Sequence, residues 1–90
     1  MKVVFCDNNN VFEDFSSWAL EDRKVYKKIL SLIKDIRRNP YSGIGKPEEL
    51  KYELSGHWSR RITEEHRLVY KISEDESMLI IVSCKSHYDI

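Results

Sequence analysis

The sequence predicts a small α+β domain with its elements in the order β-α-α-β-β-β-β. Two helical patterns follow each other almost directly near the start of the chain, and four strand patterns follow residue 51. The order implies an antiparallel-rich sheet with an αα-hairpin packed on one face. Ninety residues provide one hydrophobic core, so residues 1–90 are expected to form a single domain.

The chain is expected to begin with a strand and a short helix. Residues 2–6 are a β-branched and aromatic run, which favours a strand. The capping and turn residues at 7–10 then precede a helix over residues 11–20. Three side chains at helical spacing are expected to form its buried stripe: Phe12, Phe15 and Ala19.

The second helix is predicted over residues 23–38, with Asp22 as its N-cap. Its apolar side chains recur at helical spacing, namely Val25, Ile29, Leu32, Ile33 and Ile36. Asn39-Pro40 ends the helix, because the residue before a proline is pushed out of the helical region. The two helices have almost no connecting loop and should run antiparallel.

The loop over residues 41–50 contains the glycine and proline residues of a punctuated connection. It carries Lys46 and Glu48, with Lys51 just beyond, and such loops often hold functional residues. Strands are expected at residues 52–54, 58–63, 67–72 and 78–84, with an acidic turn at 73–77. The last strand is apolar without alternation, which indicates a central strand buried on both faces.

Side-chain alternation predicts that Arg61 and Arg67 lie together on the open face of the sheet. An odd-length loop at residues 64–66 lets Ile62 and Leu68 share the core face, since register follows burial. Arg61 and Arg67 then both point away from the core. Arg60 instead leans toward the rim of the core, over an aromatic ring, which indicates a structural role.

Charge and cysteine content exclude several classes of protein. The net charge is zero, but residues 23–46 hold eight basic residues against Asp35, so this run is either a solvated helix face or a surface that docks on a polyanion. Cys6 and Cys84 are expected to be buried, reduced thiols.

No apolar run approaches the roughly 20 residues that span a bilayer. The start of the chain does not resemble a signal peptide, so no membrane association and a cytoplasmic location are expected.

Several motifs together carry a family resemblance: Gly45-Lys46-Pro47-Glu48, Leu50-Lys51, Leu54-Ser55-Gly56, Trp58-Ser59-Arg60-Arg61-Ile62-Thr63, Glu65-His66-Arg67-Leu68-Val69-Tyr70, His87-Tyr88, and the basic pattern at residues 27–29 and 33–38. They resemble the YoeB/Txe family of bacterial toxins, which belongs to the RelE-like fold group. The chain departs from the family pattern where residues 7–10 look about two residues longer. It also continues past Tyr88 with Asp89-Ile90.

The resemblance implies the toxin of a type II toxin–antitoxin system, an endoribonuclease that cuts mRNA in the decoding site of the ribosome. It implies that Glu48 is the base, Arg67 the transition-state arginine and His87 the general acid. Lys51, Arg61 and Tyr88 match its supporting and RNA-binding positions. Expected partners are a cognate antitoxin of the YefM/Axe-like kind, the ribosome with its mRNA, and a second copy of the chain.

The chemistry of RNA cleavage without a metal suits these residue types. The 2′-hydroxyl attacks the phosphorus, a base takes its proton, fixed donors stabilise the phosphorane and an acid protonates the departing 5′-oxygen. Glutamate is ionised at neutral pH, and histidine titrates close to it. No cofactor or metal is expected, since Glu64, Glu65 and His66 lack the helical HExxH spacing.

The sequence is also consistent with two other functions. A non-catalytic protein that blocks translation by occupying the ribosome would use the basic helix equally well. Another possible function is action on a different target, as in gyrase-directed members of the RelE-like group. Those relatives lack the Glu/Arg/His set, so its presence here counts against this reading.

Overall fold

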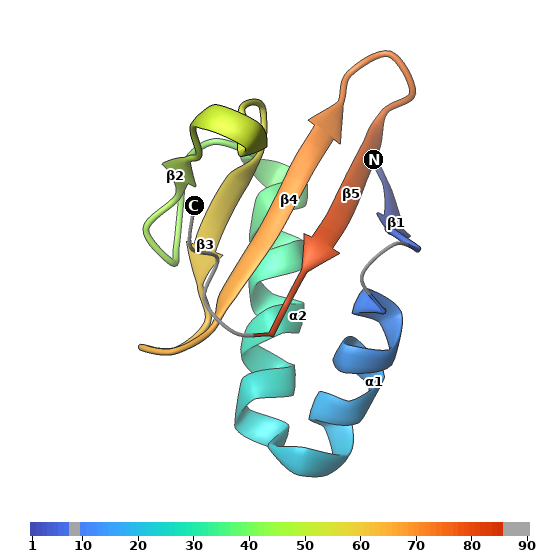
Figure 1. Ribbon diagram of the computed structural model, residues 1–90, viewed down its shortest axis with the longest axis vertical. Helices are drawn as coiled ribbons and strands as arrows, with labels where there is room; N and C mark the ends of the chain where they lie inside the picture. Colours follow the sequence, from blue (N-terminus) through green and yellow to red (C-terminus); the bar gives the residue numbers. More distant parts are fainter. Residues whose placement is uncertain (8–9, 86–90) are drawn as a thin grey trace.

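The computed structural model describes residues 1–7 and 10–85, and in this part of the chain two helices lie on one face of a five-stranded sheet (Figure 1). The elements are β1 Lys2–Phe5, α1 Val11–Glu21, α2 Arg23–Arg38, β2 Glu48–Glu49, the 3₁₀ helix η1 Tyr52–Leu54, β3 Trp58–Arg61, β4 Arg67–Ser73 and β5 Met78–Ser83. The predicted α+β class and the order of helices and strands are confirmed. No helix of the described residues is long and apolar enough to cross a membrane.

The strands lie in the order β1-β5-β4-β3-β2, with β1 parallel to β5 and every other neighbouring pair antiparallel. Strand β5 is therefore interior, between β1 and β4. Leu79 and Ile81 on one of its faces and Val82 on the other are all buried. The expected burial on both faces is confirmed, whereas the central strand of the five is β4 and β5 lies beside it.

Helix α2 is the element that the sequence predicted best. Asp22 caps it, because its carboxylate accepts hydrogen bonds from the backbone N–H groups of Lys24 (3.1 Å) and Val25 (3.3 Å). The stripe of Val25, Ile29, Leu32 and Ile36 is buried against the sheet, where it meets Leu68, Tyr70, Leu79 and Ile81. The helix runs back along α1, as expected for an αα-hairpin (Figure 1).

The predicted buried stripe of α1 was wrong in part: Phe15 does pack against the core, but Phe12 does not belong to the stripe. Phe12 is 55% exposed, whereas Val11 and Trp18 are buried and Phe15 packs at the edge of the core. The stripe thus runs i, i+4 and i+7 from Val11 rather than from Phe12. A specific contact selects Trp18, because its indole N–H donates to the carbonyl of Cys84 at 3.0 Å.

The predicted strand at residues 52–54 was also wrong, because these residues form the turn η1. Tyr52 has a φ of 59° and a side chain that is 79% exposed, neither of which suits a paired strand. The first of the four strands that follow the helices is β2, which lies earlier in the chain, inside the segment expected to be a loop. Its two residues pair with Ser59 and Trp58, so the neighbouring strand rather than local propensity defines it.

The loop between β3 and β4 has an odd number of residues, as predicted, but it is longer than predicted. Arg61 pairs with Arg67 and Arg60 with Leu68, so five residues, not three, connect the strands. Strand β3 stops at Arg61 because Thr63 turns the chain. Its hydroxyl accepts hydrogen bonds from the backbone N–H groups at residues 65 (3.1 Å) and 66 (3.0 Å). Both loop lengths are odd, so Arg61 and Arg67 share a face as predicted.

Candidate active site

A cavity of about 470 Å³ opens at the side of the sheet formed by β2, β3 and β4, with six residues in its lining: Lys46, Pro47, Glu48, Ser59, Arg61 and Arg67. Strand pairing explains why these side chains meet. Glu48 lies opposite Ser59 and Arg61 lies opposite Arg67, and directly paired residues share a face. This face is the one opposite Leu68 and the helices, so the cavity lies on the surface that the helices do not cover.

The lining carries three cationic side chains and one carboxylate. Lys46, Glu48 and Arg61 are exposed, and the ion pairs found within residues 1–7 and 10–85 involve other residues. The cations of the cavity are therefore not compensated by the rest of the described chain. An excess of positive charge around a concave surface attracts an anion, and guanidinium and ammonium groups suit phosphate oxygens.

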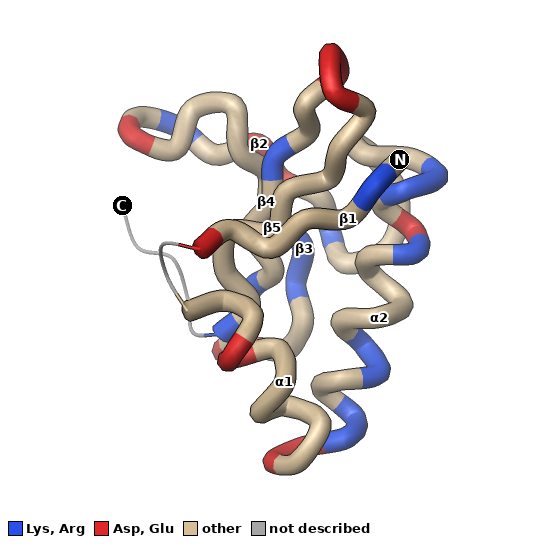
Figure 2. The backbone as a smooth tube through the Cα atoms, turned by 90° about the vertical axis from the view of Figure 1, so that its right-hand side faces the viewer, with Lys and Arg blue, Asp and Glu red and all other residues tan. Residues whose placement is uncertain are grey.

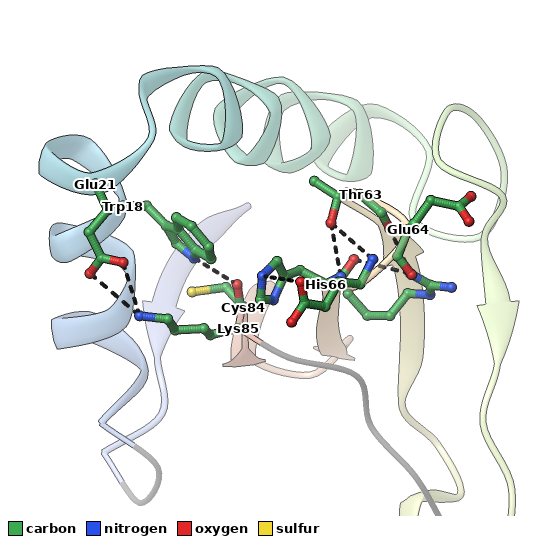
Figure 3. Close-up of polar contacts among 9 residues, drawn as sticks. Trp18, Glu21, Thr63, Glu64, His66, Cys84 and Lys85 are labelled. Atoms are coloured by element: carbon green, nitrogen blue, oxygen red, sulfur yellow. Dashed lines mark hydrogen bonds and ion pairs between the residues drawn. The ribbon is translucent and has the colours of Figure 1, made fainter.

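Arg67 is held in place by the loop that precedes it. Its Nη1 donates to the carbonyls of Thr63 (2.8 Å), Glu64 (3.2 Å) and His66 (3.2 Å), three labelled residues of Figure 3. All hydrogen bonds that this side chain makes within the described residues use Nη1. Among the contacts with described residues, the loop therefore fixes the guanidinium at one nitrogen and leaves Nε and Nη2 to a bound group.

The side chain of Arg60, next to Arg61 in the chain, lies on the opposite face of the sheet. Its side chain is fully buried, with the guanidinium 5.9 Å from the centre of the Tyr70 ring. The prediction of a structural Arg60 at an aromatic ring is therefore confirmed. The burial is deeper than expected, because a rim position would leave the guanidinium in contact with water.

The structure brings together three of the residues that the sequence singled out, Glu48, Arg61 and Arg67. Lys51 is exposed at the start of η1 and does not line the cavity. His87 and Tyr88 lie outside the described residues.

The last described residue, Lys85, is attached to α1. Its ammonium lies 3.4 Å from the carboxylate of Glu21 and 5.1 Å from the centre of the Trp18 ring (Figure 3). Trp18 also binds the carbonyl of Cys84 and contacts the ring of His66 edge-on, with 4.8 Å between ring centroids. Helix α1 thus anchors the chain immediately before its C-terminal residues.

Three residues of the cavity lining were not predicted as site residues from the sequence: Lys46, Pro47 and Ser59. Ser59 could have been found by alternation, because it lies two residues before Arg61 and therefore on the same face. Lys46 has the same relation to Glu48, but the strand that makes this spacing meaningful was not predicted. The described residues hold no group of three or more His, Cys, Asp or Glu side chains arranged for a metal ion.

The chain is similar to known bacterial toxins over nearly its whole length. The sequence model of the family described as the YoeB-like toxin of bacterial type II toxin-antitoxin systems matches residues 7–88. Toxin YoeB of Escherichia coli (strain K12) is 50% identical over 88 residues, which are 98% of this chain and 100% of that protein. Toxin YoeB of Streptomyces coelicolor is 51% identical with the same coverage.

Solved structures extend the likeness to the fold. The YoeB/ParE toxin from Agrobacterium tumefaciens has a TM-score of 0.91 and 41% identity, covering 98% of this chain and 100% of its own. A YoeB-YefM complex from Staphylococcus aureus gives a TM-score of 0.86 and 44% identity, covering 98% of both chains. The same organism's YoeB has been solved as a dimer, at 45% identity and a TM-score of 0.86. The family model spans most of the chain and half of the positions are shared with YoeB relatives, so this chain belongs to the YoeB-like toxins of bacterial type II toxin–antitoxin systems.

Proposed function

We propose that this toxin is an endoribonuclease that cuts mRNA in the decoding site of the ribosome and needs no metal ion. The observation that carries the proposal is the cavity in which one carboxylate, Glu48, faces three cations. This set of charged groups suits the cleavage of a phosphodiester by a neighbouring hydroxyl. That reaction needs one proton acceptor and several hydrogen-bond donors to the developing phosphorane.

The steps assign one role to each charged group. Glu48 takes the proton of the 2′-hydroxyl, whose oxygen forms a bond to phosphorus. The bond from phosphorus to the 5′-oxygen then breaks, which leaves a 2′,3′-cyclic phosphate on one fragment and a 5′-hydroxyl on the other. Arg61, Arg67 and Lys46 hold the phosphorane oxygens meanwhile. His87 protonates the leaving 5′-oxygen, a role that rests on the family resemblance alone.

Arg67 has the properties of a preorganised donor. Three backbone carbonyls already hold its Nη1, so little reorganisation is required when a phosphate binds the rest of the guanidinium. Its position opposite Arg61 in the hairpin allows both side chains to reach one phosphate. We assign Tyr88 to stacking on a base and Lys51 to the RNA backbone outside the cavity.

The basic side chains of α2 would dock the toxin on ribosomal RNA. Figure 2 shows Lys and Arg distributed along this helix, whose single acidic residue, Asp35, is turned toward Arg60. The exposed surface of α2 is consequently basic although the whole chain has a net charge of zero. Electrostatic attraction to a polyanion depends on such a local field.

The partners follow from the family. A YefM-like antitoxin would neutralise the toxin, as the YoeB-YefM complex of S. aureus indicates, with an acidic or apolar segment laid over the cationic cavity. The YoeB dimer of the same organism supports a homodimer. Action on translating ribosomes places the toxin in the cytoplasm.

The test compares two neighbouring glutamates that alternate across the sheet. Purified wild type, Glu48→Gln and Glu49→Gln are each mixed with 70S ribosomes and a short defined mRNA, and cuts are mapped by primer extension. Glu48 lines the cavity, whereas Glu49 is opposite Trp58 and faces the other way. Loss of a general base slows a reaction by about 10²–10⁴-fold, so only Glu48→Gln should lose the cut. Equal cleavage by both variants would remove Glu48 from the mechanism.

A second candidate function rests on α2 alone. A toxin that only occupies the ribosome would need the basic helix and not the cavity. In the same reaction it would leave the mRNA intact while translation stops, and Glu48→Gln would arrest translation as well as wild type does.

A further inference from the structure

Behind the cavity, on the core side of β3, lies a polar cluster of the buried residues Arg60 and Tyr70 with the partly exposed Asp35, which we call the clamp. The Arg60 side chain has no exposed surface and donates five hydrogen bonds. Nη1 donates to Asp35 Oδ2 (2.7 Å) and to the Ile44 carbonyl (2.9 Å), and Nη2 donates to the carbonyls of Asn39 (2.8 Å) and Ser42 (3.1 Å). Nε donates to Tyr70 Oη at 3.2 Å. The Tyr70 hydroxyl donates in turn to the Pro40 carbonyl at 2.6 Å.

All four of these carbonyl groups belong to residues 39–44, the segment that joins α2 to the cavity. Asp35 adds another bond to the same segment, because its carboxylate accepts from the backbone N–H of Ile44 at 3.1 Å. Burial raises the pKa of the Tyr70 phenol, so its hydroxyl keeps the proton that it donates to Pro40. The clamp therefore replaces the regular hydrogen bonding that this segment lacks.

Two glycines let the backbone approach the clamp. Gly43 has a φ of 129°, and a Cβ there would collide with the carboxylate of Asp35. Gly45 has a φ of 80°, and its carbonyl accepts a hydrogen bond of 2.6 Å from the backbone N–H of Arg61. The segment is thus fixed first to the clamp and then to β3, just before the chain reaches Lys46 and Glu48.

We infer that Arg60, held by Asp35 and Tyr70, is a positioning residue that sets Lys46 and Glu48 against Arg61 and Arg67 across the cavity. Strand β2 has only two residues at the edge of the sheet, so its own ladder fixes it weakly. Lys46 has a φ of 51°, a conformation that a lysine keeps only where its surroundings impose it. The clamped segment is the part of those surroundings that leads directly into Lys46.

A buried ion pair is a weak source of stability, because packed apolar side chains of similar volume often serve as well. The value of an arginine here lies in its fixed fork of donors, which binds several carbonyls in one arrangement. The part of this inference that concerns reaction rate rests on the proposed endoribonuclease function, whereas the part that concerns the position of the segment does not.

The experiment compares two buried neighbours of the same core layer. Tyr70 and Ile81 are paired across the sheet and both are fully buried, but only Tyr70 bonds to the segment. Tyr70→Phe keeps the ring and removes the hydroxyl, while Ile81→Val weakens the core without touching the clamp. Single-turnover cleavage of ribosome-bound mRNA is measured for both, well below their unfolding temperatures and over a range of toxin concentrations.

We expect Tyr70→Phe to lower the maximal cleavage rate about tenfold or more at an unchanged half-saturating concentration, because a shift of about 1 Å in a positioned group can cost up to 10²-fold. Ile81→Val should keep the wild-type rate. Equal maximal rates for the two variants would overturn the inference. If Tyr70→Phe does not fold, Asp35→Asn at the partly exposed end of the clamp is measured in its place, with the same two outcomes.

A second readout separates this inference from the proposed function. Hydrogen exchange of the Ile44 amide, which Asp35 holds, is followed in the same variants without ribosomes. Faster exchange in Tyr70→Phe than in Ile81→Val supports the clamp even if wild type cuts no mRNA, an outcome that would refute only the endoribonuclease. Equal exchange in both variants refutes the clamp whatever the cleavage assay gives.

Discussion

Two glycines with similar positive φ angles are expected to respond differently to the same substitution. Gly45 has a φ of 80° and Gly56 has a φ of 88°, both in the left-handed region. An alanine in this region costs roughly 1–2 kcal/mol relative to glycine. A Cβ at Gly56 would meet no heavy atom within 4 Å, so Gly56→Ala should cost that amount and no more.

Gly45→Ala carries the same conformational cost and a steric cost in addition. Its Cβ would lie 2.8 Å from Leu32 Cδ2 and 3.2 Å from both Arg60 Cβ and the Arg61 carbonyl oxygen. Leu32 is fully buried and the other two atoms belong to β3, so none of them can move aside without a shift in the core. Overpacking of this kind adds about 1–3 kcal/mol. The expected loss for Gly45→Ala is therefore about 2–5 kcal/mol.

Urea unfolding followed by tryptophan fluorescence measures both losses, with the free energy obtained by linear extrapolation. For a chain of this size each 1 kcal/mol should also move the Tm by about 4–8 °C. Because Gly45 directly precedes Lys46, Gly45→Ala should further reduce cleavage in the ribosome assay, whereas Gly56→Ala should not. If both alanines cost the same free energy, the close packing of the segment against α2 and β3 would be refuted.

Three further outcomes are expected. The pKa of Asp35 is lowered from 3.8, first by its hydrogen bond from the buried guanidinium and then by a backbone N–H, so this group stabilises the fold above its unfolded pKa. The stability gap between wild type and Asp35→Asn should consequently shrink as the pH falls below 3.8 and through the lowered value, and a gap independent of pH would contradict this. Burial raises the pKa of Cys84 to about 12, so a thiol reagent at pH 8 should modify Cys6 in the native protein and reach Cys84 only after unfolding, as mass spectrometry would show. Lys46→Ala should slow ribosome-dependent cleavage about 10- to 100-fold, the loss of one charge-assisted hydrogen bond, and Lys51→Ala should slow it less. A larger effect at Lys51 would show that the cavity lining does not define the site.

The parts of the fold that were predictable depend on periodicity within one element. Helix α2 has one apolar stripe and a capping aspartate, so its sequence leaves a single arrangement. Helix α1 has aromatic side chains on several faces, and the buried one is selected by a carbonyl at Cys84, 66 positions away. No local pattern contains that information. The same holds for β2, whose two glutamates have little tendency to form a strand and do so because β3 lies beside them.

The site was predictable to a similar extent. Arg61 and Arg67 could be placed together because loop parity and burial constrain a hairpin strongly. Lys46 and Lys51 are the same residue type and both lie close to Glu48 in the sequence. Choosing which of them lines the cavity therefore required the position of β2. The structure places Lys46 in the cavity and Lys51 outside it.

Arg60 and Arg61 show how a chain of zero net charge can present a cationic cavity. The two residues are chemically identical and adjacent, and strand alternation sends one into the core and the other into the cavity. The buried guanidinium must be compensated, and it takes Asp35, the only acidic residue in α2. That pairing engages the only carboxylate within α2, so it does less to offset the exposed lysines and arginines of the helix. The burial of Arg60 therefore organises the segment before Glu48 and at the same time leaves the surface of α2 basic.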